Sequence, residues 1–157
     1  MKLNYLLIVL ATLLFASCDK DHSRMDDKEI QDYLDSHNIT NAKEDASGIY
    51  YVIHEEGEGM HPYYYTTVQI MYKGYLTNDE VFDDTHVDEI WETRVDNFIK
   101  GFQIGLQKMR PGGKATIFVP SHLAYGSDAS FSNSEDLADI PKWAVLIFDI
   151  DLVGFKQ

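Results

Sequence analysis

The sequence predicts an α+β fold in which an antiparallel sheet wraps around one short helix, with a helical extension on its N-terminal side. Two long stretches, Thr66–Leu76 and Ala144–Val153, alternate apolar and polar residues as half-buried strands do. Between them lies one segment of helical periodicity, where Phe102, Leu106 and Met109 are spaced i, i+4 and i+7. Strands therefore dominate, and a single helix is available to pack on them.

The first residues have the pattern of a secretory signal. Lys2 supplies the positive charge, and Leu3–Phe15 is an apolar run too short to span a bilayer comfortably. Two small residues then precede Cys18, the one cysteine of the chain, so no internal disulfide can form. This arrangement resembles a bacterial lipobox. We expect residues 1–17 to be removed and Cys18 to be acylated, which anchors the chain to a membrane of the cell envelope, facing the periplasm or the surface. The alternative is an ordinary signal peptide that ends near a free cysteine.

The charge of the chain excludes one class of partner. The 157 residues carry a formal net charge of −13, and removal of the signal deletes one more positive charge, that of Lys2. An acidic protein repels phosphate backbones and anionic headgroups, so we expect no nucleic acid partner. Any contact with a membrane is then expected to come from the lipid.

A short helix is expected between the signal and the domain. Within residues 18–47, Asp19–Asp27 is polar and predicted to be a tether, and Asp27–Ile39 is predicted to be amphipathic. Its apolar residues, at i, i+3 and i+4, are Ile30, Tyr33 and Leu34. Asn38 is suited to end this helix. We expect the helix to pack on the domain of a monomer; the alternative is that it mediates dimerisation.

The globular domain is expected over residues 48–157. The predicted strands are Ile49–His54, Thr66–Leu76, Val81–Asp83, Lys114–Val119 and Ala144–Val153. Pro111 and Gly112 suit the central positions of a type II turn between the helix and the next strand, which Pro120 ends. The domain thus contains several strands and one helix.

Five motifs, in order along this domain, resemble those of the FKBP-type peptidyl-prolyl cis-trans isomerases. They are Tyr72–Leu76 with Val81–Asp83, Phe98–Gly101, Gly105–Met109 with Gly112–Ala115, Leu123–Gly126, and Ile140-Pro141 with Leu146–Leu152. The resemblance implies a strongly twisted half-barrel sheet around the helix. It also implies isomerisation of Xaa-Pro bonds in proline-containing polypeptides, binding of the family's macrolide ligands, and no cofactor or metal ion.

The resemblance also assigns roles to individual residues. The cavity would be lined by Tyr72, Phe82, Phe98, Ile99, Phe102, Tyr125 and Phe148. Asp83 would lie at the rim, bonded to Tyr72 or to the bound chain, and Ile140 would form part of the lip. The Ile99 N–H and the Tyr125 hydroxyl would meet substrate carbonyls. One further aromatic of the family has two candidates here, Trp91 and Ile90. The alternative is that these aromatic side chains are simply core.

Two departures from the family pattern bear on activity. Phe102 stands where the family usually has tryptophan on the cavity floor; phenylalanine keeps a flat apolar floor of smaller area, so we expect reduced activity. The loop over residues 127–139 is longer and more acidic than usual, which suits basic clients, a cap over the cavity, or a solvated insertion. A non-catalytic chaperone or binding module with a degenerate pocket is therefore the alternative function. A structural lipoprotein whose pocket is filled by its own side chains is a third.

Other chemistries find no support in the sequence. The six histidines are scattered without the spacing of metal ligands. No Ser-His-Asp or Cys-His set is visible, and no glycine loop suits a phosphate. We therefore expect no metal site and no nucleophilic catalysis.

Overall fold

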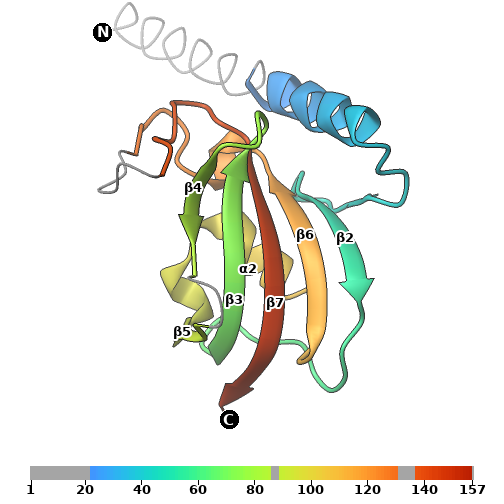
Figure 1. Ribbon diagram of the computed structural model, residues 1–157, viewed down its shortest axis with the longest axis vertical. Coiled ribbons are helices and arrows are strands. Elements are labelled where there is room, and N and C mark those ends of the chain that lie inside the picture. Colours follow the sequence, from blue (N-terminus) through green and yellow to red (C-terminus); the bar gives the residue numbers. More distant parts are fainter. Residues whose placement is uncertain (1–21, 86–88, 131–136, 157) are drawn as a thin grey trace, which may run out of the picture.

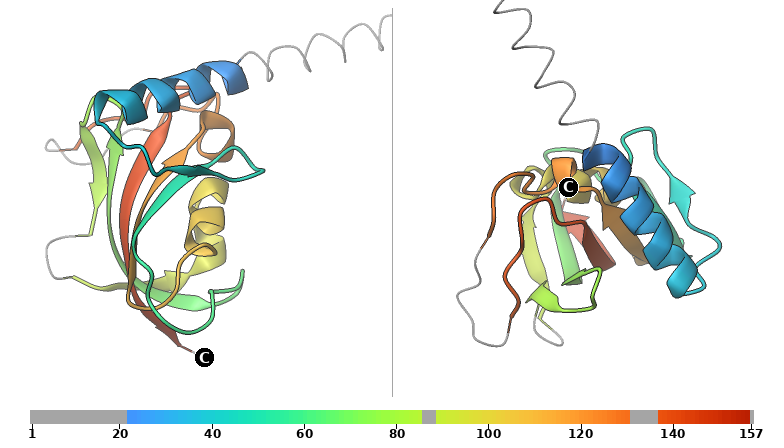
Figure 2. Two further views of the ribbon diagram at one scale, coloured as in Figure 1. Left: turned by 90° about the vertical axis from the view of Figure 1, so that its right-hand side faces the viewer. Right: turned by 90° about the horizontal axis from the view of Figure 1, so that it is seen from above.

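The computed structural model describes residues 22–85, 89–130 and 137–156, so the signal segment and Cys18 lie outside the described residues. Within these ranges the domain is an antiparallel seven-stranded sheet that curves around α2 (Figures 1 and 2). The elements are β1 (Lys43–Glu44), β2 (Tyr50–Glu55), β3 (Thr67–Leu76), β4 (Val81–Asp84), β5 (Trp91–Arg94), η1 (Val95–Asn97), α2 (Lys100–Leu106), β6 (Gly113–Val119), η2 (Ser121–Leu123) and β7 (Leu146–Lys156). The predicted α+β class is confirmed. No helix in the described ranges combines the length and apolar character that crossing a membrane requires.

The sheet is built around the pairing of β3 with β7. The strand order is β1-β2-β6-β7-β3-β4, and β3 pairs with β7 along its whole length. The other edge of β3 is divided between two short strands, because β5 pairs with residues 67–70 and β4 with residues 73–75. Tyr72 lies at this division. On this edge of the sheet, Tyr72 therefore lies in the gap between β5 and β4.

The core lies between the sheet and α2. Val68 and Ile70 of β3 and alternate residues of β7 point toward α2 and are buried, as the alternation in the sequence predicted. Phe102, Leu106 and Met109 meet them from the helix side. The side chains that alternate with these point to the opposite face of the sheet.

The N-terminal helix, residues 22–36, covers part of that opposite face at one end of the sheet (Figure 1). Its predicted apolar residues pack against Phe118 and Ile147, which confirms packing on the domain. Asn38 ends the helix at a φ of 56°, and the Ile39 N–H donates to the Leu34 carbonyl at 2.8 Å.

The structure corrects the predicted start of this helix. Residues 22–27 are helical, although the sequence suggested that they belong to a tether. The reason is Asp26, which is 2% exposed and accepts hydrogen bonds from the Ser121 N–H (2.9 Å) and the Ser121 hydroxyl (2.7 Å). This partner lies 95 residues away, so the hydrogen bonds that stabilise the helical conformation of this polar segment form only in the folded chain.

Replacement of Asp26 by alanine should lower the free energy of unfolding by about 2–4 kcal/mol. The substitution leaves two donors of the fully buried Ser121 without an acceptor. Urea unfolding of the protein measures this loss. The matched control is Lys28→Ala in the same helix, which removes only an exposed ion pair with Asp32 and should cost roughly 0.5 kcal/mol or less. Equal effects of the two substitutions would contradict the buried anchor.

Candidate active site

Aromatic side chains from six segments gather on the α2 side of the sheet, next to the divided edge of β3. They enclose a cavity of about 160 Å³. Its lining consists of Tyr72, Phe82, Asp83, Trp91, Asn97, Phe98, Ile99, Phe102, Tyr125 and Phe148. The structure thus brings together all the residues that the family motifs suggested for the lining and the rim, and it adds Asn97, which no motif indicated.

Phe102 forms the floor of this cavity. It is 1% exposed, and its ring stacks on that of Phe98 with centroids 4.3 Å apart. Tyr72 and Phe148 meet it edge-on, at 5.6 Å and 4.9 Å. Edge-to-face and offset contacts of this kind are favourable beyond their buried area. The floor is therefore flat, apolar and held on three sides.

Of the two candidates for the further aromatic position, Trp91 lines the cavity and Ile90 does not. The Trp91 ring lies 5.8 Å from that of Tyr72 and 5.3 Å from that of Phe98, and it lines the cavity. Ile90 is 50% exposed and is not part of the lining. Because Trp91 belongs to β5, the short strand that the sequence did not reveal, its position depends on the divided edge of β3.

Ile140, which was expected at the lip, is not among the residues that line the cavity. It is 6% exposed and packs in the core instead of contributing to the cavity lining. Its backbone is bridged to Ser130, with the Ile140 N–H donating to the Ser130 carbonyl at 2.7 Å. This bridge closes the base of the loop and turns the isoleucine inward.

Two tyrosine hydroxyls are among the polar groups of the cavity, beside the side chains of Asp83 and Asn97. Tyr72 donates a hydrogen bond to Asp83, and burial, followed by that hydrogen bond, raises the pKa of Tyr72 far above its usual value. Tyr125 is 42% exposed, and its hydroxyl has no hydrogen-bond partner within the described part of the chain. Burial first, and then the Asp83 charge, raise the pKa of Tyr125 as well. Both phenols therefore remain protonated donors over the physiological pH range.

A further polar residue, Gln103, was missed by the sequence analysis. It is 6% exposed, and its Nε2 donates to the Phe98 carbonyl at 2.7 Å, while its Oε1 has no partner among the described residues. The Phe98 carbonyl and the Ile99 N–H belong to one peptide group, so this bond fixes the direction of that N–H. No acceptor for the Ile99 N–H is present in the described ranges. The one available signal was a glutamine beside Phe102 on a short, largely apolar helix.

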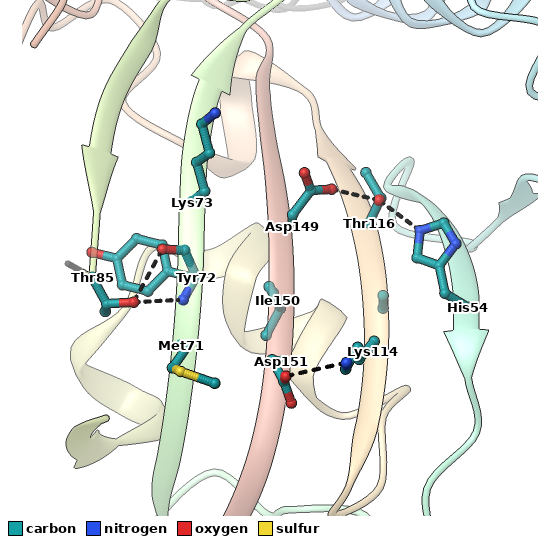
Figure 3. Close-up of a pocket in the computed structure, with 11 residues that line it drawn as sticks. His54, Met71, Tyr72, Lys73, Thr85, Lys114, Thr116, Asp149, Ile150 and Asp151 are labelled. Carbon is teal, nitrogen blue, oxygen red and sulfur yellow. Dashed lines mark hydrogen bonds and ion pairs between the residues drawn. The ribbon is translucent and has the colours of Figure 1, made fainter. Parts of the chain in front are cut away.

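A larger hollow, of about 700 Å³, lies on the opposite face of the sheet (Figure 3). There His54 Nε2 lies 2.8 Å from Thr116 Oγ1, which donates to Asp149 at 2.6 Å. This is no nucleophile relay, because the threonine stands between histidine and carboxylate and already gives its proton to Asp149. Within the described residues, no group of three or more His, Cys, Asp or Glu side chains could hold a metal ion. The aromatic cavity is the better candidate for chemistry.

The chain belongs to the FKBP-type peptidyl-prolyl cis-trans isomerase family, which it matches over residues 60–153. It is similar to the FKBP-type peptidyl-prolyl cis-trans isomerase FkpA of Escherichia coli K12, with 32% identity over 115 residues, which are 73% of this chain and 40% of that protein. The FkpA of Aeromonas hydrophila is 33% identical over 149 residues, 90% of this chain and 51% of that protein. The chain thus spans about half the length of these curated relatives, or less.

The crystal structure of FkpA from Escherichia coli has a similar fold. It superposes with a TM-score of 0.70 and 29% sequence identity, over 90% of this chain and 63% of that one. The likeness extends beyond the family match at residues 60–153, since 90% coverage must include much of the N-terminal part.

Proposed function

We propose that this protein is a peptidyl-prolyl cis-trans isomerase that accelerates rotation about Xaa-Pro bonds in exported polypeptides, with residues 48–157 as its catalytic domain. The observation that carries the proposal is the aromatic cavity with two donors, the Ile99 N–H and the Tyr125 hydroxyl, that find no acceptor among the described residues. The cavity, of about 160 Å³, is below the roughly 300–1,000 Å³ typical of pockets for drug-sized ligands, which suits one small apolar ring.

The reaction itself needs no nucleophile. Resonance holds the prolyl amide planar, with a barrier to rotation of about 18–20 kcal/mol. At the top of that barrier the C–N bond has lost its double-bond character, and the twisted amide carries less charge separation than the planar one. An apolar cavity therefore disfavours the planar ground state more than the twisted transition state, which is the differential binding that lowers a barrier.

Seven of the lining residues have a role in this scheme. Phe102 and its neighbours Phe98 and Phe148 receive the proline ring and exclude water. The Ile99 N–H and the Tyr125 hydroxyl donate to carbonyls on either side of the rotating bond, so that the chain is held while the amide turns. Tyr72 and Asp83 bond to each other at the rim.

The alternative proposal is a non-catalytic binding module. The observation that favours it is Phe102, which offers a smaller floor than the tryptophan usual in the family. In that case the cavity would hold a proline without distinguishing the planar from the twisted amide.

Isomerase assays on Xaa-Pro peptides separate the two functions. We expect acceleration by the wild-type protein, a loss of about tenfold or more in kcat/KM for Tyr125→Phe because a transition-state donor is removed, and a gain of a few fold for Phe102→Trp. A macrolide ligand of the family should compete with the peptide. No acceleration by the wild type, with a large gain for Phe102→Trp, would identify a binding module instead.

Gln103→Leu tests how the Ile99 N–H is directed. Loss of the bond to the Phe98 carbonyl and removal of the unpartnered Oε1 offset each other, so the free energy of unfolding should change by no more than about 1 kcal/mol. The kcat/KM should nevertheless fall by about three- to tenfold, because the N–H is no longer held in one direction. Gln107→Leu, at an exposed glutamine one turn further along, is the matched control and should change neither quantity. A fall in kcat/KM that merely follows a fall in stability would argue against positioning.

We also propose that the protein acts as a lipid-anchored monomer in the bacterial cell envelope. The apolar run, the small residues and Cys18 support export and acylation, and the apolar face of the N-terminal helix is used within the chain, which leaves it unavailable for dimerisation. Mass spectrometry of the mature protein should find a diacylglyceryl-modified Cys18 as its first residue, and Cys18→Ser should release the protein from membranes. An unmodified Cys18 in a membrane-free protein would refute the anchor.

A further inference from the structure

A second cavity, of about 480 Å³, shares the lining residue Tyr125 with the first. Its lining consists of Ser23, His122, Ala124, Tyr125, Gly126, Ser127 and Trp143. Tyr125 lines both cavities, so a polypeptide bound in the proline cavity beside Tyr125 lies close to the second cavity. No role in the isomerase scheme above requires this second space.

The N-terminal helix supplies one wall of the second cavity. Ser23 belongs to this helix, and the preceding residue, His22, stacks on Trp143 with ring centroids 3.9 Å apart and planes inclined by 7°. The Asp26–Ser121 hydrogen bonds fix this end of the helix beside η2, the turn that leads to Tyr125. The wall is therefore a fixed part of the fold, although it lies outside residues 60–153 that match the family.

Trp143, which also lines the cavity, has a backbone conformation that is costly for a large side chain. Its φ is 58°, in the left-handed region that disfavours residues other than glycine, asparagine and aspartate by about 1–2 kcal/mol. The Trp143 N–H donates to the Gly126 carbonyl at 2.7 Å, and the stacked His22 holds the indole. Strain of this kind persists where the surroundings enforce it, and it clusters at binding sites. The left-handed backbone conformation of Trp143 is thus an energetic cost of the folded state, and the residue in that conformation supplies an indole to the cavity lining.

We propose that the second cavity is a substrate subsite that takes an aromatic side chain of the same polypeptide whose proline occupies the first cavity; this rests on the isomerase function proposed above. Because the two cavities share Tyr125 as a lining residue, the bound chain itself is the occupant that this proposal names. The seven lining residues include no carboxylate, ammonium or guanidinium group, although the chain as a whole is strongly acidic, so apart from the His122 imidazole nothing there pairs with a charged side chain. The Trp143 and Tyr125 rings favour an aromatic occupant.

Peptide binding to the full-length protein tests the subsite. The peptides contain one Xaa-Pro bond and carry phenylalanine, or alanine as the matched reference, two to four residues before or after the proline. An extended chain advances about 3.3 Å per residue, so this range scans the reach of the cavity. Titration calorimetry should give about tenfold tighter binding for phenylalanine than for alanine at one of these positions, since tenfold corresponds to burial of part of a phenyl ring.

Two variants of the protein should abolish this preference by opposite means. Trp143→Asn removes the indole, while asparagine suits the left-handed backbone and so preserves the fold. Ser23→Phe fills the cavity from the exposed face of the helix. In both we expect the phenylalanine-to-alanine affinity ratio to fall to about one. The control is Tyr64→Ala, which removes an aromatic side chain that lines neither cavity and should leave the ratio unchanged.

The outcomes separate the subsite from the isomerase function. A wild-type ratio near one at every position, or a ratio that survives both Trp143→Asn and Ser23→Phe, overturns the subsite, whatever the turnover. A ratio that depends on Trp143 and Ser23 supports the subsite even if no peptide is isomerised, in which case only the isomerase function fails.

Discussion

The close packing of α2 against β6 is the constraint on which the cavity depends. A methyl group on Gly101 would lie 2.2 Å from a Val119 methyl, and one on Gly105 would lie 2.7 Å from Ile117. Only hydrogen at these two positions lets the helix come so near the sheet. This approach sets Phe102 at the base of the cavity and, through Gln103, fixes the peptide of Phe98 and Ile99. The floor and one donor of the site thus follow from two glycines that never touch a substrate.

Parts of the fold that rest on local patterns could be predicted from the sequence. The alternation in β3 and β7 and the periodicity of α2 reflect which face is buried, because the residues of the buried core cluster are apolar. The start of the N-terminal helix could not be predicted, because it depends on Asp26 finding Ser121 across the fold. β5 was missed for a similar reason, since its four residues are largely exposed and become a strand only by pairing with β3.

The candidate site, like the fold, could be predicted from the sequence only in part. Its aromatic lining was predictable because family motifs name those residues in order, whereas the backbone bridge between Ile140 and Ser130 is not visible in any motif. Gln103 carried no motif, since its partner is a backbone carbonyl and any buried donor at that position would serve. Trp143 could not be interpreted from sequence either, because its importance lies in a left-handed φ and in a stacking partner 121 residues away.

Rotation about a prolyl bond transfers no proton, so the site needs no group whose pKa lies near neutrality. The shifts at Tyr72 and Tyr125 are upward, away from neutrality, which keeps both phenols as donors. Chemistry of this kind requires little of individual side chains beyond a suitable shape and the exclusion of water. Selectivity among polypeptides must then come from surfaces next to the cavity. In this chain those surfaces include Trp143 and the N-terminal helix, so the extension that precedes the family domain is where differences in client choice are expected to arise.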